Sequence, residues 1–229
     1  KNAIISLKQL KVNKDMLHFL VRILHEVNKK RLSAKKAAQS IKLIESHFIR
    51  RALAFHAAEA GGTGMQQKFI NLWSKTGGNP KKVKDFFNSS DKDIPNDTDF
   101  RKGIETAEIY NMERISRFII FKYEKYLSKI KPEVYPNQHI KTIDHINPQS
   151  HNEKGNNKIE YEETLHLLGN LLPMSKELNA SKGCRKIDQE LKDELNEKSM
   201  FVTTEKWLKD QKDSNKWKPQ DIKDRTKKM

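Results

Sequence analysis

The residues best suited to chemistry lie in and after the stretch TIDHINPQSH, residues 142–151. Asp144 and His145 stand side by side there, after a short run rich in β-branched residues. Further along, the segment LGNLLPMSKELNASKG contributes Asn170 and Asn179, which lie nine residues apart. Taken singly, an Asp–His pair is a common strand-end ion pair and an asparagine is a common turn or cap residue. Only a fold that brings the four side chains together makes them a site.

Together these four side chains contain the parts of a phosphodiesterase. Asp144 and Asn179 offer hard oxygen ligands, which suit Mg²⁺ or Mn²⁺ better than zinc. His145 is left free to act as a base, because an imidazole has an unperturbed pKa near 6.5. Either the Asn170 side chain or a main-chain carbonyl is available to hold the second ring nitrogen. Phosphodiester hydrolysis needs this division of labour, since a water must lose a proton while a cation neutralises the growing negative charge.

The motifs D-H-I-N-P-Q, L-G-N-L-L and S-K-E-L-N-A-S-K resemble those of HNH nucleases, also called His-Me finger or ββα-metal nucleases. More closely, they resemble the C-terminal nuclease domain of the GmrSD-type restriction endonucleases. The resemblance implies that Asp144 and Asn179 bind the metal, that His145 is the general base and that Asn170 orients it. The chain departs from the pattern in three ways. Asp144 stands where glutamate is common, the connection from His145 to Asn170 is long, and the last ligand is asparagine in place of histidine.

Two cationic side chains are predicted to contact a DNA phosphate. Lys182 follows Asn179 by three residues, and Arg225 closes the spacing W-x4-I-x2-R. That spacing, formed by Trp217, Ile222 and Arg225, resembles the closing element of the same family. For Arg225 a structural ion pair is the alternative.

Other histidines near the motifs are expected to play lesser parts. His166 is predicted to be a packed histidine or one that supports the site residues from outside the site. His151, which precedes a polar loop, is predicted to face solvent or to lie near the phosphate. A metal-binding role is the less favoured alternative for both.

The surrounding pattern predicts a mainly α-helical protein with two domains. Residues 13–130 repeat apolar side chains with helical spacing, and the proline-bearing stretch KPEVYPNQ then interrupts the pattern. We expect a helical domain over 1–133 and a small α+β domain with an HNH ββα-metal motif over 134–229. The elements expected in the second domain are a strand at 140–146, a loop at 153–158, a strand at 170–174 and helices beyond.

The net charge of the chain indicates which class of partner it binds. The 229 residues carry a formal net charge of +15 and a pI of about 9.7, which attracts polyanions such as nucleic acid. No apolar run approaches the roughly 20 residues of a membrane helix. The single cysteine, Cys184, rules out an internal disulfide and fits a reducing cytoplasm.

The chain begins without methionine, so we expect that residues upstream are missing. By resemblance, such proteins carry an upstream ParB-like domain that uses a nucleotide, and they act as bacterial antiphage factors or as restriction factors against modified DNA.

The leading interpretation is a cytoplasmic, metal-dependent endonuclease that nicks or cleaves double-stranded DNA, including modified DNA. Two alternatives remain at this point. The first is a catalytically inactive HNH fold that only binds DNA, which predicts salt-dependent binding without cutting. The second makes the helical half a docking module for another domain or subunit.

Overall fold

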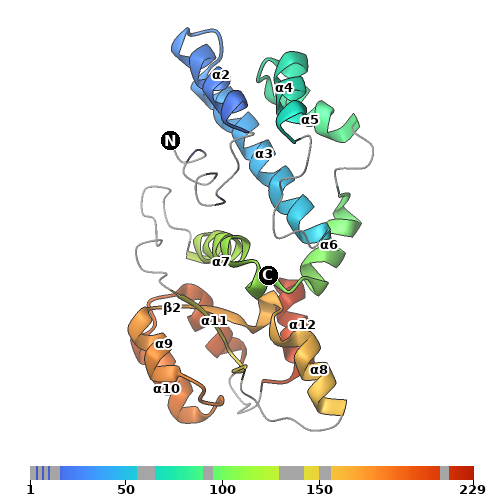
Figure 1. Ribbon diagram of the computed structural model, residues 1–229. Coiled ribbons are helices and arrows are strands. Elements are labelled where there is room, and N and C mark those ends of the chain that lie inside the picture. Colours follow the sequence, from blue (N-terminus) through green and yellow to red (C-terminus); the bar gives the residue numbers. More distant parts are fainter. Residues whose placement is uncertain are drawn as a thin grey trace. The chain divides into compact units, whose positions relative to one another are not determined.

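The computed structural model describes Ile4, Leu7, Leu10 and residues 16–55, 65–89, 95–128, 142–149, 156–211 and 217–229. Two compact units divide the chain, one formed by residues 1–103 and the other by 104–229. We call them the helical unit and the second unit (Figure 1). Within the described residues, none of the helices is long and apolar enough to cross a membrane.

The described part of the helical unit from residue 16 onward contains four helices and the start of a fifth. These are α2 (Leu17–Asn28), α3 (Ala34–Ala54), α4 (Met65–Thr76), α5 (Pro80–Ser89) and α6 (Asp97–Thr106). The predicted caps are present, because Ser33 accepts a hydrogen bond from the Lys36 amide and Asn79 accepts one from the Lys81 amide ahead of α5. The predicted cap at Asn13 lies outside the described residues.

A single apolar stripe on each helix forms the core of the helical unit. The most completely buried side chains belong to α2, α3, α4 and α5: Phe19, Ile23, Ile44, Leu53, Phe69, Leu72 and Val83. Helix α3 is the long central element against which α2 and α5 pack (Figure 1). The predicted helical spacing is confirmed as core packing in part, because Leu17, Leu24 and Phe55, which share that spacing, remain exposed.

The second unit begins with η2 (Ile109–Asn111) and α7 (Glu113–Ser128) and then becomes mixed α and β. Its further elements are β1 (Thr142–His145), α8 (Asn156–Leu165), η4 (Leu168–Asn170), β2 (Leu171–Met174), α9 (Lys176–Lys182), α10 (Gln189–Lys198), α11 (Val202–Asp210) and α12 (Pro219–Lys228). The prediction of a mainly helical protein is thus confirmed. Helix α8 was missed, because its first residues were assigned to a glycine- and asparagine-rich loop.

The two strands pair antiparallel, with Asp144 opposite Leu172 and His145 opposite Leu171. Both faces of β2 are buried, so it reads as a continuous apolar run and not as an alternating one. One hydrophobic cluster collects residues from β2, from α9 to α12 and from the segments between elements: Ile146, Leu167, Leu172, Met174, Leu178, Ile187, Leu191, Leu195, Trp207, Trp217 and Ile222.

A buried carboxylate joins α7 to α11 within the second unit. Glu124, 3% exposed, accepts hydrogen bonds from the amides of Val202 and Thr203 and from the Thr203 hydroxyl. These are the first donors of α11, where a negative charge is favoured by the helix dipole. Helix α7 therefore belongs with the strands. The compact units divide at 103/104, thirty residues before the domain boundary predicted from the prolines, which lies outside the described residues.

Candidate active site

Strand β1 delivers the Asp–His pair to the edge of the hydrophobic cluster. His145 is 2% exposed, whereas the Asp144 side chain, which points to the other face of the strand, keeps 22% exposure. The strand is held by its register with β2 and by the Thr142 hydroxyl, which donates to the Met174 carbonyl. One residue is thus enclosed and its neighbour remains accessible.

The His145 ring is held by a second histidine and an aromatic ring. Its Nε2 lies 3.1 Å from Nδ1 of His166. Tyr110 covers both imidazoles, with ring centroids 4.0 Å from His145 and 5.5 Å from His166. The Tyr110 amide also donates to the His166 carbonyl at 3.1 Å, so η2 and the end of α8 are tied together behind the site.

This enclosure sets the protonation of the imidazole. Burial, together with nearby His166 and Lys182, lowers the pKa of His145 to about 3. The ring is therefore neutral at pH 7 and keeps one nitrogen lone pair. The lone pair lies at Nδ1 if Nε2 carries the hydrogen and donates to His166, and at Nε2 if His166 is the donor.

Asn170 fixes the main chain that follows His145. Fully buried in η4, its side chain accepts from the Asn147 amide at 3.0 Å and donates to the carbonyls of Leu165 and Asn147 at 2.9 and 3.3 Å. Its own carbonyl accepts from the Ile146 amide at 2.7 Å. Asn170 thus bonds the backbone just beyond His145, while the ring itself is bonded by His166.

The C-terminal helix closes over the residues beside Asn170. Arg225 of α12 donates to the carbonyls of Gly169 and Leu171 at 2.6 and 3.0 Å, one on each side of Asn170. The Gly169 amide donates to the Thr226 hydroxyl, and a Cβ at Gly169 would lie 2.0 Å from the Ile222 carbonyl oxygen. The glycine of the L-G-N motif is therefore required by close packing of α12.

Burial lowers the pKa of the Arg225 guanidinium to about 10, so it remains charged at pH 7. Its charge is directed at carbonyl oxygens inside the fold. The spacing of Trp217, Ile222 and Arg225 is explained by packing inside the fold. Trp217 and Ile222 belong to the hydrophobic cluster, and Arg225 donates hydrogen bonds to the backbone of η4 and β2. The predicted contact of Arg225 with a phosphate stays a prediction.

Asp144 already faces a cation. The Lys182 ammonium of α9 lies 2.7 Å from Oδ2 of Asp144, and the Lys182 side chain is 1% exposed. Asn179 stands one turn earlier in α9, and residues three apart share a helix face. Asn179 is therefore expected on the side of the helix from which Lys182 reaches Asp144. A place for its side chain beside the Asp144 carboxylate stays a prediction. Because Lys182 is buried in this pair, its predicted contact with a phosphate also stays a prediction.

The donor set is suited to a hard divalent cation. The described residues contain no group of three or more His, Cys, Asp or Glu side chains placed to hold a metal. One carboxylate and one amide oxygen are nevertheless enough for Mg²⁺, which usually keeps several of its waters. The Lys182 ammonium lies against the Asp144 carboxylate, so a divalent cation bound at that oxygen would have to displace it.

Sequence reasoning missed several supporting residues. Tyr110 lies 35 positions before His145, and nothing in the local sequence links the two rings. Asn147, which donates to the Trp217 carbonyl at 2.5 Å, was not among the predicted site residues. The supporting role predicted as one option for His166 matches its place behind His145. His151 lies outside the described residues.

The comparisons with known proteins identify the second unit. A family model described as the C-terminal domain of GmrSD restriction endonucleases matches residues 94–229, more than half of the chain. Searches of curated proteins and of solved structures found no match. The matched range contains α6, α7 and all the site residues described above. The chain therefore belongs to the GmrSD restriction endonuclease family and contains its C-terminal domain.

Proposed function

We propose that this chain is a metal-dependent DNA endonuclease of the HNH type, in which β1, β2 and α9 form the ββα-metal motif. Membership of a restriction endonuclease family supports DNA as the substrate. The observation that carries the proposal is the neutral imidazole of His145, anchored 3.1 Å from His166 and next in the strand to the partly exposed Asp144 carboxylate.

In this proposal His145 is the general base and acts through Nδ1. A neutral imidazole has one N–H, and Nδ1 is a base only if the hydrogen is on Nε2. Nε2–H then donates to Nδ1 of His166, 3.1 Å away. His166 must therefore be neutral, with its own hydrogen on Nε2. Proton transfer from a water to Nδ1 of His145 produces an imidazolium whose Nε2–H remains held by His166.

Asp144 and Asn179 are the residues that would hold Mg²⁺ or Mn²⁺. Such an ion, when bound, stabilises negative charge on the phosphate and on the leaving oxygen. Within the chain, Asn170 and Arg225 keep the main chain around His145 in place, and Tyr110 shields the two imidazoles. Asn170 thereby takes the orienting role that the family resemblance implies, acting through the backbone.

The test is a plasmid assay with Mg²⁺ or Mn²⁺, in which nicked and linear forms are separated from supercoiled DNA. Replacing His145 with Ala or Asn should lower the rate by a factor of about 10² to 10⁴, because the base is lost, while affinity for duplex DNA stays the same. His18→Ala, a change at an exposed histidine of α2, is the matched control and should cut like the parent.

Thermal melting of each variant establishes that the fold is intact. Equal cutting by His145→Asn and the parent would refute the assignment of the base. A parent protein that binds DNA with the usual salt dependence but does not cut with any divalent ion would favour the inactive DNA-binding interpretation. The Asp144–Lys182 pair gives that second interpretation its one structural argument, because an ammonium could replace the metal permanently.

A further inference from the structure

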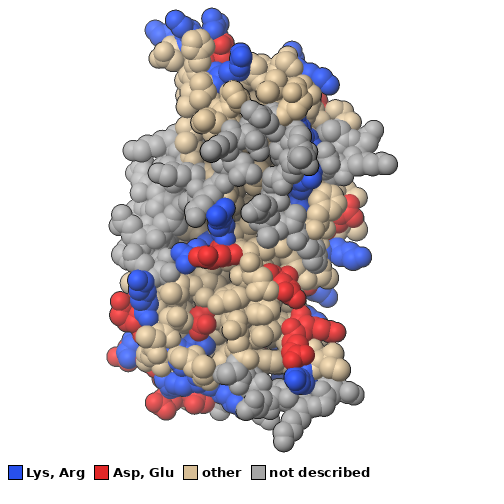
Figure 2. All heavy atoms as spheres, in the orientation of Figure 1, with Lys and Arg blue, Asp and Glu red and all other residues tan. Residues whose placement is uncertain are grey.

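The two units differ sharply in charge. Residues 1–103 contain 21 Lys and Arg against 9 Asp and Glu, a net charge of +12, whereas residues 104–229 contain 24 against 21, a net of +3. On the face drawn in Figure 2, the charged groups of the helical unit are mostly blue on a largely tan surface, while blue and red groups are mixed over the second unit. The attraction for a polyanion therefore resides mainly in the unit that lacks the candidate active site.

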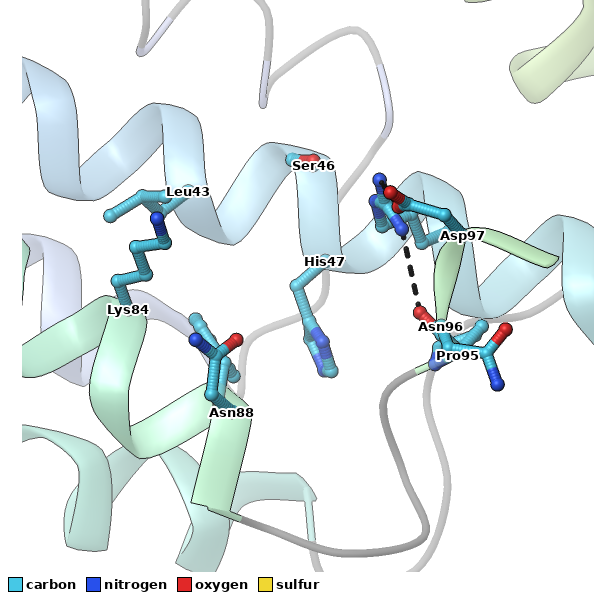
Figure 3. Close-up of a pocket in the computed structure, with 10 residues that line it drawn as sticks. Leu43, Ser46, His47, Lys84, Asn88, Pro95, Asn96 and Asp97 are labelled. Atoms are coloured by element: carbon cyan, nitrogen blue, oxygen red, sulfur yellow. Dashed lines mark hydrogen bonds and ion pairs between the residues drawn. The ribbon is translucent and has the colours of Figure 1, made fainter. Parts of the chain in front are cut away.

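Within the helical unit, α3 and α5 border a pocket of about 640 Å³. Successive turns of α3 form one wall of the pocket, and two turns of α5 form the opposite wall. The start of α6 closes one end. The lining residues are Leu43, Ser46, His47, Arg50, Lys84, Phe87, Asn88, Pro95, Asn96 and Asp97. Figure 3 shows Lys84 and Asn88 rising from α5 toward the α3 wall, with the His47 ring between the walls.

The floor of this pocket is aromatic and its rim is polar. His47 and Phe87 are buried and stack on each other, with ring centroids 4.3 Å apart. Lys84 and Asn88 are exposed and stand one turn apart on α5, while Ser46 is exposed on α3. The rim thus presents an ammonium, an amide and a hydroxyl, which are the side-chain types that commonly contact phosphate oxygens.

Arg50 stands at the other end of the pocket in a fixed position. Its guanidinium donates to Asp97 at 2.6 Å and to the Pro95 carbonyl at 3.4 Å, and it lies over the Phe100 ring at 4.7 Å. The Arg50 side chain still keeps 29% exposure, and a guanidinium has five N–H donors. Asp97 offsets part of its charge, so Lys84 is the cation of the rim with the greater free charge.

We propose that this α3–α5 groove, defined by Ser46, Arg50, Lys84 and Asn88, binds the phosphodiester backbone of the nuclease's DNA substrate. The inference rests on the proposed function of the second unit for the identity of the DNA. Its own support is the charge of the helical unit and the donors on the rim. Contacts of this kind are made to the backbone, so they hold DNA without reading its sequence.

The experiment measures binding of a fluorescent DNA duplex to the full chain by anisotropy, in EDTA and over a series of salt concentrations. Lys84→Ala should weaken binding by roughly three- to tenfold and lower the slope of log K against log salt by about 1, because one phosphate contact is lost. Asn88→Ala should weaken binding less and leave the slope unchanged, since an amide releases no counterion.

Lys82→Ala is the matched control, because Lys82 is an exposed lysine of the same helix that does not line the groove. It removes the same charge and should change the affinity by less than about twofold. Equal effects of Lys82→Ala and Lys84→Ala would overturn the groove as a binding site. Displacement of the duplex by polyglutamate as readily as by unlabelled DNA would show an acidic peptide site instead.

The outcome is separable from that of the proposed function. DNA binding in EDTA requires neither His145 nor a metal, so the groove can be confirmed even if the plasmid assay detects no cutting. The converse result is a parent protein that cuts DNA normally and a Lys84→Ala variant that binds and cuts as well as the parent does. That result would leave the nuclease assignment intact and would contradict DNA binding by the groove.

Discussion

The helical unit and the second unit place their polar groups in opposite ways. In the helical unit most charged side chains lie at the surface, and lysine and arginine exceed the acids by twelve. In the second unit the charges nearly balance, but His145, Asn170, Lys182 and Glu124 are all buried. Each of these four buried groups has a hydrogen-bond or ion-pair partner.

The difference suggests how the chain divides its work. Surface charge provides attraction at a distance and tolerates substitution, because exposed charges are screened and loosely coupled. A buried polar network orients a few atoms and is sensitive to any missing partner. Substitutions in the second unit should therefore affect cutting or local stability more than binding, and those in the helical unit should do the reverse.

The largest effect is expected from Asn170→Ala. The change leaves the Asn147 amide and two main-chain carbonyls without their partner in a buried region, which should cost about 2–4 kcal/mol. Hydrogen exchange should show lost protection in β1, η4 and β2, with unchanged protection in α2 to α5. Asn71→Ala, at an exposed asparagine of α4, is the control and should change little. Uniform loosening of both units would contradict their independence.

A second prediction concerns the tautomer of His145. His166→Leu removes the acceptor of Nε2–H and should lower the cutting rate by roughly 10- to 100-fold with unchanged duplex affinity, as is usual for residues that orient a functional ligand. His166→Gln retains a carbonyl acceptor and should recover part of the rate. In ¹⁵N spectra His145 should carry its hydrogen on Nε2 in the parent and populate both tautomers in the Leu variant. Equal rates for the Leu and Gln variants would show that His166 only fills space.

The helical unit could be predicted from the sequence more completely than the buried polar contacts of the second unit. Helices of the helical unit, and the caps at Ser33 and Asn79, follow from local periodicity and local hydrogen bonds. The pairing of Tyr110 with His145 and of Lys182 with Asp144 joins residues 35 and 38 positions apart, and no local rule encodes such contacts. Motif resemblance indicated the family, and the family model confirmed it.

The predicted domain boundary at 133/134 stays a prediction, whereas the compact units divide at 103/104. The prolines after α7 resembled a linker, yet α7 packs with the second unit because Glu124 binds the first amides of α11, 78 residues later. Similarly, α8 begins in a stretch of asparagines and lysine whose composition is typical of a loop. Tertiary contacts decided both outcomes, and a single sequence does not display them.

A third prediction tests whether the buried lysine competes with a metal. Lys182→Met keeps the length of the side chain but removes the ammonium, which lies 2.7 Å from Asp144. Binding of Mn²⁺, followed by electron paramagnetic resonance, should strengthen by roughly three- to tenfold, the equivalent of an ion pair of about 1 kcal/mol. Asp144→Asn should weaken Mn²⁺ binding in both backgrounds. If Lys182→Met instead abolished Mn²⁺ binding, the lysine would be needed to hold the carboxylate in place.

The smallest effect is expected at Glu194 of α10, which links α10 to the end of α9. Its carboxylate accepts from Ser181, Lys198 and Arg185 at 2.5, 3.0 and 2.7 Å, and these donors lower its pKa from about 4.5 to about 2. Because the pKa is lower in the folded state, the stabilisation is present above pH 4.5 and is lost as the pH falls toward 2. Glu194→Gln should therefore lower the melting temperature at pH 7, and the difference from the parent should shrink below pH 4.5.

Glu197→Gln provides the comparison for that pH series, because Glu197 is an exposed glutamate of the same helix. It should melt like the parent at every pH. Melting curves of the Glu194 variant and the parent that stay parallel down to pH 2 would show that this carboxylate does not hold α9. The site would then be supported by the buried charges of the second unit and not by the partly exposed carboxylate of Glu194. The two units would differ more clearly, with functional charges at the surface of the helical unit and in the interior of the second unit.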